Sequence, residues 1–228
     1  MHESGPILAL IPARGGSKSI PRKNLREIAG KPMIAHSIAH GQASSLINRL
    51  IVTTDDPEIA NVARSFGAEV PFLRPTEFAQ DLSTDYEFVR HALEWLRDHE
   101  NYRPELVVQL RPTTPAREVR LIDRAIAAMR ARPEADSLRA VAAACFTPYK
   151  MWRIGPDGYL DPLLALAGVA EPYNQPRQVL PEVVQQDGFI DIVRPRTIFE
   201  QNSITGRRIL PFFIDRESID IDDEHELV

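Results

Sequence analysis

Short apolar runs alternate with stretches of helical periodicity through the first 130 residues of the chain. The candidate strands are the runs 7–11 (ILALI), 49–54 (RLIVTT), 69–73 and 105–110 (ELVVQL). The candidate helices, in which apolar residues recur every three or four positions, are 31–45, 57–66 and 84–96. Because strands and helices alternate, we predict an α/β fold with a doubly wound, mainly parallel sheet and right-handed crossovers.

The pattern continues in the second half with one interruption. Residues 116–130 are a predicted helix, and the further candidates are strands at 137–146, 188–193 and 209–214 with a short helix at 195–201. Residues 149–181 instead hold five prolines and three glycines with little periodicity, yet include Trp152, Tyr159 and Tyr173. We considered a lid on the same domain and favour an arm that buries its apolar side chains in a second subunit. The predicted domains are therefore 1–148 with 182–228, and an inserted dimerisation arm at 149–181.

Composition narrows the function classes. With 228 residues, 43% apolar and 26% charged, the chain has the make-up of a soluble globular protein with one main domain. A formal charge of −5 argues against general nucleic-acid binding. No apolar run approaches the ~20 residues of a membrane helix, and no secretory signal is apparent. The single Cys145 reads as a small buried residue, so we expect a cytoplasmic protein without membrane contact.

The first strand leads into a loop that is rich in glycine and positive charge. Between Pro12 and Lys31, six basic residues accompany a single acid, Glu27, although the chain as a whole is acidic. Backbone amides at Gly15 and Gly16 and the hydroxyl of Ser17 are suited to phosphate oxygens. Such a loop at the carboxyl end of a strand is where open α/β sheets hold nucleotides. It contains neither the P-loop nor the dinucleotide motif, which disfavours a kinase.

An acidic segment near the other end of the chain complements this loop. Residues 215–226 hold seven acids, and within them Ile219 and Ile221 alternate with Asp220 and Asp222. In extended backbone, the two aspartates share one face and the two isoleucines the opposite, buried face. Adjacent carboxylates repel each other unless a cation lies between them or one takes up a proton, and Mg²⁺ shared with nucleotide phosphates is the usual cation. A solvated acidic tail is the alternative, which the alternation of isoleucines disfavours.

Six motifs, taken in order, resemble those of the cytidylyltransferases that activate sialic acids and related acidic sugars. They are ARGGSKSIPRKN at 13–24, IVTTD at 51–55, LRPTEFAQD at 73–81, LVVQLRPTTP at 106–115, QPRQVLP at 175–181 and IDID at 219–222. The resemblance implies a fold like that of the nucleotide-diphospho-sugar transferases. It also implies a homodimer, Mg²⁺ as cofactor, and attack of the sugar's anomeric hydroxyl on the α-phosphorus of CTP.

The resemblance also implies roles for individual residues. The nucleotide-binding residues would be Arg14, Gly15, Ser17, Lys23, Asn24, Arg74, Asp81 and Ser83, with Arg14, Lys23 and Asp220 acting on the reacting phosphate. The sugar-binding residues would be Gln109, Lys150, Arg177, Gln185 and Asp191, and the metal ligands Asp220 and Asp222.

Two of these positions depart from the family's pattern. Where sialic acid enzymes generally continue as R-x-N-G-A-I-Y, this chain has Gln185 in place of the arginine and Asp191 in place of the tyrosine. An acid at that place would repel a carboxylate ligand or take up a proton. The sugar is therefore open among sialic acid, a related nonulosonic acid, another acidic sugar such as a 3-deoxy-octulosonate, and an amino sugar paired with Asp191. The remaining alternatives are a nucleotidyltransferase that uses another nucleoside triphosphate or a neutral sugar phosphate, and a non-catalytic nucleotide-binding protein.

Overall fold

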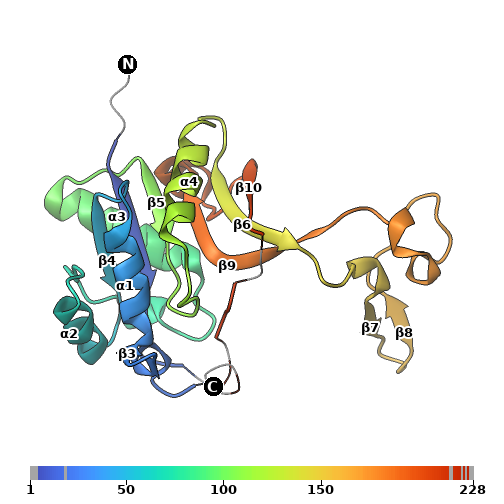
Figure 1. The fold of residues 1–228 in the computed structure, drawn as a ribbon, viewed down its shortest axis with the longest axis horizontal. Coiled ribbons are helices and arrows are strands. Elements are labelled where there is room, and N and C mark those ends of the chain that lie inside the picture. Colours follow the sequence, from blue (N-terminus) through green and yellow to red (C-terminus); the bar gives the residue numbers. More distant parts are fainter. Residues whose placement is uncertain (1–4, 18–19, 216–217, 222, 224, 226–228) are drawn as a thin grey trace. The chain divides into compact units, whose positions relative to one another are not determined.

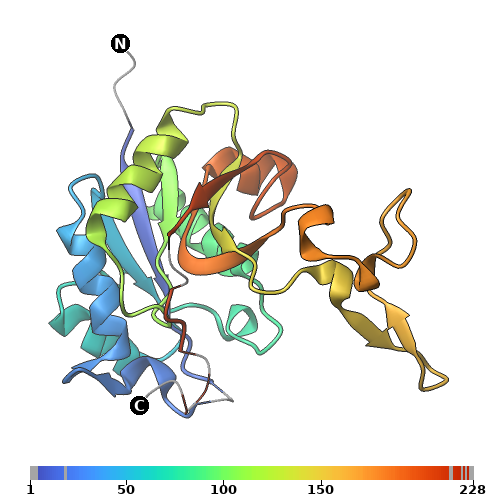
Figure 2. The same cartoon turned by 45° about the vertical axis from the view of Figure 1, so that its right-hand side comes forward.

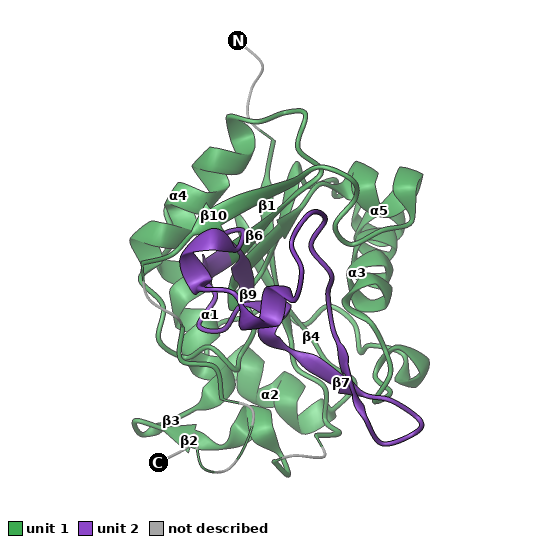
Figure 3. Ribbon diagram, turned by 90° about the vertical axis from the view of Figure 1, so that its right-hand side faces the viewer, with its two compact units in different colours: residues 1–140, 187–228 green, residues 141–186 purple. Residues whose placement is uncertain are grey.

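The computed structural model describes residues 5–17, 20–215, 218–221, 223 and 225. The chain divides into two compact units (Figure 3): unit 1 comprises residues 1–140 and 187–228, and unit 2 comprises residues 141–186. Among the described residues, no helix combines the length and the apolar character needed to cross a membrane.

A six-stranded sheet organises unit 1 (Figure 1). In spatial order its strands are β10 (Ile209–Phe213), β6 (Ser137–Ala143), β9 (Val184–Val193), β5 (Leu106–Gln109), β1 (Ile7–Pro12) and β4 (Arg49–Thr53). Strand β1 lies between β4 and β5 and is parallel to both, whereas β9 runs antiparallel to β5. The apolar run 7–11 is completely buried, as expected for a central strand covered on both faces.

Helices cover both faces of the sheet (Figure 3). Helix α1 (Met33–Ala43) packs against α2 (Pro57–Ser65) and α4 (Val119–Arg130), whereas α3 (Asp85–Glu100) packs against α5 (Pro195–Gln201). The starts of two helices are set by the sequence. Asp56 caps α2 by accepting hydrogen bonds from the amides of Glu58 and Ile59, and Thr84 forms a capping box with Glu87 at α3.

Unit 1 also contains short elements in its loops. They are the 3₁₀ turns η1 (Lys23–Leu25) and η2 (Thr76–Phe78) and the two-residue strands β2 (Glu27–Ile28) and β3 (Lys31–Pro32).

Unit 2 is a small segment with little regular structure. Its elements are η3 (Pro148–Lys150), the antiparallel pair β7 (Trp152–Ile154) and β8 (Leu160–Pro162), η4 (Pro172–Asn174) and η5 (Arg177–Val179). The rings of Trp152 and Tyr173 pack with centroids 4.4 Å apart. Ile154 and Tyr159 are nevertheless more than 70% exposed, so much of the apolar surface of this unit remains uncovered.

The predicted fold class and most predicted elements are confirmed, and three expectations are wrong. Residues 69–73 form a single bridge, from Glu69 to Ile51, because Pro71 has no N–H to extend the ladder. Cys145 is exposed rather than buried. Of the two isoleucines predicted to share a buried face, only Ile221 is buried; Ile219 is 60% exposed, and residues 218–221 form no strand.

Candidate active site

The loop after β1 and the acidic C-terminal segment meet in unit 1. Ile20 from the loop and Ile221 from the tail share one buried cluster with Met33 of α1. The backbone N–H of Ile221 donates to the carbonyl of Thr113 (2.8 Å), in the loop after β5. Figure 2 shows the described part of the tail, in red, running along unit 1 toward the blue N-terminal elements. Asp220 precedes Ile221 in the chain, so it is held close to the basic loop on which Ile221 packs.

Hydrogen bonds within unit 1 fix the shape of the basic loop. The N–H of Gly15 donates to Asp55 Oδ1 (2.9 Å), and Asn24 Nδ2 donates to the carbonyl of Arg14 (3.0 Å). A side chain at Gly15 would place its Cβ 2.8 Å from Asp56 Oδ2, so the close approach requires glycine. A Cβ at Gly16 would meet no atom within 4 Å. The amide of Gly15 therefore shapes the loop, while the Gly16 side faces open space.

Several predicted nucleotide-binding residues lie together. Arg14 Nη1 donates to the carbonyl of Gln80 (3.0 Å) and to Asp81 Oδ1 (3.1 Å), which links the basic loop to residues 80–84. Ser83 Oγ accepts from the N–H of Gln80 (3.0 Å) and donates to the carbonyl of Glu77 (3.1 Å). Lys23 is buried, and Ser17 is partly exposed.

Arg74 is anchored inside unit 1. Its Nε donates to Thr53 Oγ1 (3.1 Å), another guanidinium nitrogen donates to the Thr53 carbonyl, and the group lies 4.8 Å from the ring centroid of Phe88. Burial lowers the pKa of Arg74 to about 10. The side chain is thus still cationic at neutral pH.

Asp220 has the features of a metal ligand. Its Oδ1 is buried and has no hydrogen-bond partner among the described residues. A Cβ at Gly188 would lie 3.1 Å from Asp220 Oδ2, so glycine there lets the tail approach β9 closely. The second predicted ligand, Asp222, lies outside the described residues. A buried carboxylate oxygen without a donor fits a hard divalent cation.

Arg117 organises the backbone around Asp220, a role that no sequence motif indicates. The residue is 7% exposed, and its guanidinium donates to the carbonyls of Arg111 (2.7 Å) and Phe189 (2.6 Å) and to Ser37 Oγ (2.9 Å). Burial lowers the pKa of Arg117 to about 9, and the charge of Asp220 opposes this shift. Arg117 thus joins the β5 loop, β9 and α1 behind the tail.

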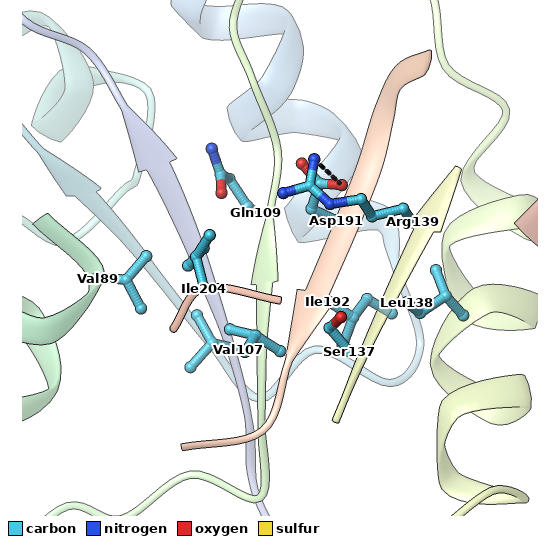
Figure 4. Close-up of a pocket in the computed structure, with 10 residues that line it drawn as sticks. Val89, Val107, Gln109, Ser137, Leu138, Arg139, Asp191, Ile192 and Ile204 are labelled. Carbon is cyan, nitrogen blue, oxygen red and sulfur yellow. Dashed lines mark ion pairs between the residues drawn. The ribbon is translucent and has the colours of Figure 1, made fainter. Parts of the chain in front are cut away.

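A row of alternating charges lies beside Gln109 on one face of the sheet. Gln109 Nε2 and Arg111 Nη2 both donate to Asp85 Oδ2 (3.0 and 2.7 Å). Arg111 Nη2 also donates to Asp191 Oδ2 (2.9 Å), and Arg139 Nη1 lies 3.7 Å from Asp191 Oδ1. Burial alone would lower the pKa of Arg111, but the two aspartates raise it above its usual value. Gln109, Arg139 and Asp191 line a small pocket (Figure 4).

This arrangement changes the interpretation of Asp191. The sequence suggested that an acid here would repel a carboxylate ligand, take up a proton or pair with an amino group of the sugar. Two arginines of the protein already balance its charge. Asp85, Arg111 and Arg139 were not among the predicted site residues; the position of Arg111 just beyond a central strand was the one available signal.

The remaining predicted sugar-binding residues belong to unit 2. Lys150 ends η3 and is exposed, and Gln185 is partly exposed in the first part of β9. Arg177 begins η5, and its guanidinium donates to the carbonyl of Ala144 (2.7 Å), which is also in unit 2.

The described residues form an α/β protein with a central, mainly parallel sheet and a basic loop that follows its first strand. The structure of a CMP:2-keto-3-deoxy-manno-octonic acid synthetase complexed with CTP matches it with a TM-score of 0.69 and 17% identity, covering 96% of this chain and 94% of that one. At this identity the match shows the fold alone. A sequence model of the family described as Cytidylyltransferase matches residues 8–152, and the chain belongs to this family.

Two curated relatives are more similar to this chain in sequence than that structure is. The N-acylneuraminate cytidylyltransferase of Escherichia coli O18:K1:H7 is 30% identical over 218 residues, which cover 95% of this chain and 49% of the relative. The CMP-N,N'-diacetyllegionaminic acid synthase of Legionella pneumophila is 42% identical over 120 residues, or 53% of this chain and 51% of that protein. The chain thus spans about half the length of these relatives.

Proposed function

We propose that this protein transfers CMP from CTP to a nonulosonic acid and releases pyrophosphate. The observation that carries the proposal is the meeting of the basic loop with the segment of Asp220, through Ile20 and Ile221. A cationic loop and a metal-binding carboxylate at one place are what a magnesium–triphosphate complex needs. Membership of the cytidylyltransferase family and the names of the two curated relatives support the choice of CTP and of an acidic sugar.

In the proposed reaction the anomeric hydroxyl of the sugar attacks the α-phosphorus of CTP. A bond forms between that oxygen and phosphorus, the bond to the β-phosphate oxygen breaks, and pyrophosphate leaves with the electron pair. The proton of the hydroxyl passes to solvent. Lys23 and Arg14 hold the phosphates and balance the charge that gathers on them, with Ser17 and Asn24 beside them. Arg74, Asp81 and Ser83 border the cytosine.

Mg²⁺ is part of the proposal. The buried, unpartnered Oδ1 of Asp220 fits it, with Asp222 as the second protein ligand. The described residues contain no cluster of three or more metal-binding side chains, so triphosphate oxygens would complete the coordination. When bound, Mg²⁺ supplies positive charge to the phosphates.

A turnover panel tests the proposal. Pyrophosphate release is measured with each of the four nucleoside triphosphates, Mg²⁺, and one sugar at a time: N-acetylneuraminic acid, a di-N-acetylated nonulosonic acid, an amino nonulosonic acid or a 3-deoxy-octulosonate. We expect release with CTP and at least one nonulosonic acid. Release only with the octulosonate, or only with another triphosphate, would replace the proposed substrate, and no release at all would contradict catalysis.

Within unit 1, Gln109 is the proposed contact of the sugar, with the paired Asp191 beside it. Within unit 2, the proposed sugar contacts are Lys150, Arg177 and Gln185. Arginine can pair with a carboxylate through two hydrogen bonds, so Arg177 is the proposed partner of the sugar's acid group. We place the reaction in the cytoplasm, where nucleoside triphosphates are made.

We further propose that unit 2 forms a homodimer with its exposed apolar surface. We predict that the protein sediments as a dimer at micromolar concentration. Replacing both Ile154 and Leu160 by aspartate should yield monomers, because each charge would have to be buried in the interface. The matched control is the same double change at Leu82 and Phe213, which are exposed in unit 1 and should leave the dimer intact. A wild-type monomer at this concentration contradicts the prediction.

A further inference from the structure

Gln109 is a buried polar residue at the end of a central strand, and its neighbours hold its side-chain amide in one orientation. It is the last residue of β5 and is 4% exposed. In the register of the sheet it lies opposite Asp191 of the antiparallel β9, so the two side chains project from the same face. Figure 4 shows both at the end of the pocket where Arg139 also points.

The hydrogen bond to Asp85 determines which end of the Gln109 amide faces which way. An ionised carboxylate accepts hydrogen bonds and donates none, and Asp85 is paired with Arg111 at 2.7 Å. The atom of Gln109 that lies 3.0 Å from Asp85 Oδ2 must therefore be the NH₂ nitrogen. The carbonyl oxygen Oε1 then points away from Asp85, and no described residue donates a hydrogen bond to it.

The row of charges makes this orientation rigid. Asp85 is held by Arg111, Arg111 is held in turn by Asp191, and Arg139 approaches the far oxygen of Asp191. The two cations and two anions alternate, so each carboxylate lies beside a guanidinium. A flip of the Gln109 amide would set its carbonyl against Asp85 Oδ2, acceptor against acceptor, which such a partly buried site strongly disfavours.

We propose that Asp85, Arg111 and Asp191 are positioning residues that lock Gln109 as a hydrogen-bond acceptor, so that the substrate must present a donor to it. The donor is a hydroxyl or the N–H of an acylamino group on the sugar. A carbonyl or ether oxygen at that place would meet Oε1 and be rejected. The identification of this ligand as a sugar rests on the proposed function. The fixed orientation of the Gln109 amide, which we call the lock, does not depend on it.

The lock is tested without turnover. In ¹H–¹⁵N spectra of the full-length protein, the Gln109 side-chain NH₂ signals, assigned by their loss in Gln109→Leu, should shift in Asp85→Asn, which can turn either end toward Gln109. Glu87→Gln is the matched control: it makes the same change of charge in the same helical turn, and glutamine can keep the capping box. Unchanged signals in Asp85→Asn, or equal shifts in both variants, overturn the lock.

The demand for a donor is tested by kinetics with the sugar that the wild-type enzyme uses. Asp85→Asn should raise the KM for that sugar about tenfold, the effect of about one hydrogen bond, with the KM for CTP unchanged and Glu87→Gln like wild type. The second measurement uses sugar analogues in which one hydroxyl or N–H donor at a time is methylated on its oxygen or nitrogen. For one of these analogues, the kcat/KM of the wild-type enzyme should fall about 10²-fold or more, and the kcat/KM of Gln109→Leu should fall far less.

The outcomes separate this inference from the proposed function. A shift in the spectra without turnover of any sugar leaves the lock standing, contradicts the proposed function and overturns the assignment of a sugar donor. Turnover with no loss for any methylated analogue upholds the proposed function and overturns the donor requirement.

Discussion

Replacing Asp220 by asparagine is expected to lower kcat by about 10²- to 10³-fold, the loss usual when one electrostatic group in a phosphoryl- or acyl-transfer site is removed. Asparagine keeps the size and one oxygen of the side chain, so the packing of the neighbouring Ile221 in its cluster should survive. The negative charge disappears, and with it the attraction for a divalent cation. The KM for the sugar should change little, because the effect is on the triphosphate.

Binding of Mn²⁺ in the presence of CTP, followed by electron paramagnetic resonance, gives a readout that does not depend on turnover. Asp220→Asn should weaken this binding, while Asp215→Asn should leave both binding and kcat within about twofold, because that acid is exposed two residues beyond β10. Unaltered Mn²⁺ binding in Asp220→Asn would contradict the assignment of this residue as a ligand.

Replacing Arg117 by methionine is expected to reduce the free energy of unfolding by about 4 kcal/mol, among the larger effects of a single substitution. Methionine has a similar length but donates no hydrogen bond. The carbonyls of Thr114 and Phe189 would lose the donor that they share, and each buried acceptor left unpaired costs about 1–3 kcal/mol, whereas the Arg111 carbonyl keeps its hydrogen bond from Ser37 Oγ (3.0 Å). Asp220 would also lose a nearby positive charge.

Urea denaturation, with the slope compared between variants, measures this loss. Arg120→Met is the matched control, because that arginine lies three residues further along the chain, with its side chain 77% exposed and paired with Glu118. It should change stability by no more than about 0.5 kcal/mol. A loss in Arg117→Met below about 1 kcal/mol would show that water or local rearrangement satisfies the carbonyls. Arg117→Lys should lie in between, because lysine keeps the charge without the planar fork.

The predicted elements that were confirmed share a local cause. Strand β1 and helix α3 were identified because a buried strand and a one-faced helix each leave a distinct spacing of apolar residues. The start of α3 follows from Thr84 and Glu87, whose interaction spans three residues. For the acidic segment the same kind of pattern was misleading. The alternation predicted two buried isoleucines, but residues 218–221 form no strand, and Ile221 is held by Thr113 and by the cluster that contains Ile20.

The sequence by itself determined the α/β class, the order of its elements, the charged character of both chain ends and the family motifs. All of these depend on residue type and on short-range spacing. Only the tertiary structure decided that Gly15 gives its amide to Asp55, that Arg117 supports the loops near Asp220, and that Arg111 and Arg139 balance Asp191. Each of these contacts joins residues at least six and up to eighty positions apart, and a charged residue's sequence neighbours do not reveal which distant partner folding brings to it.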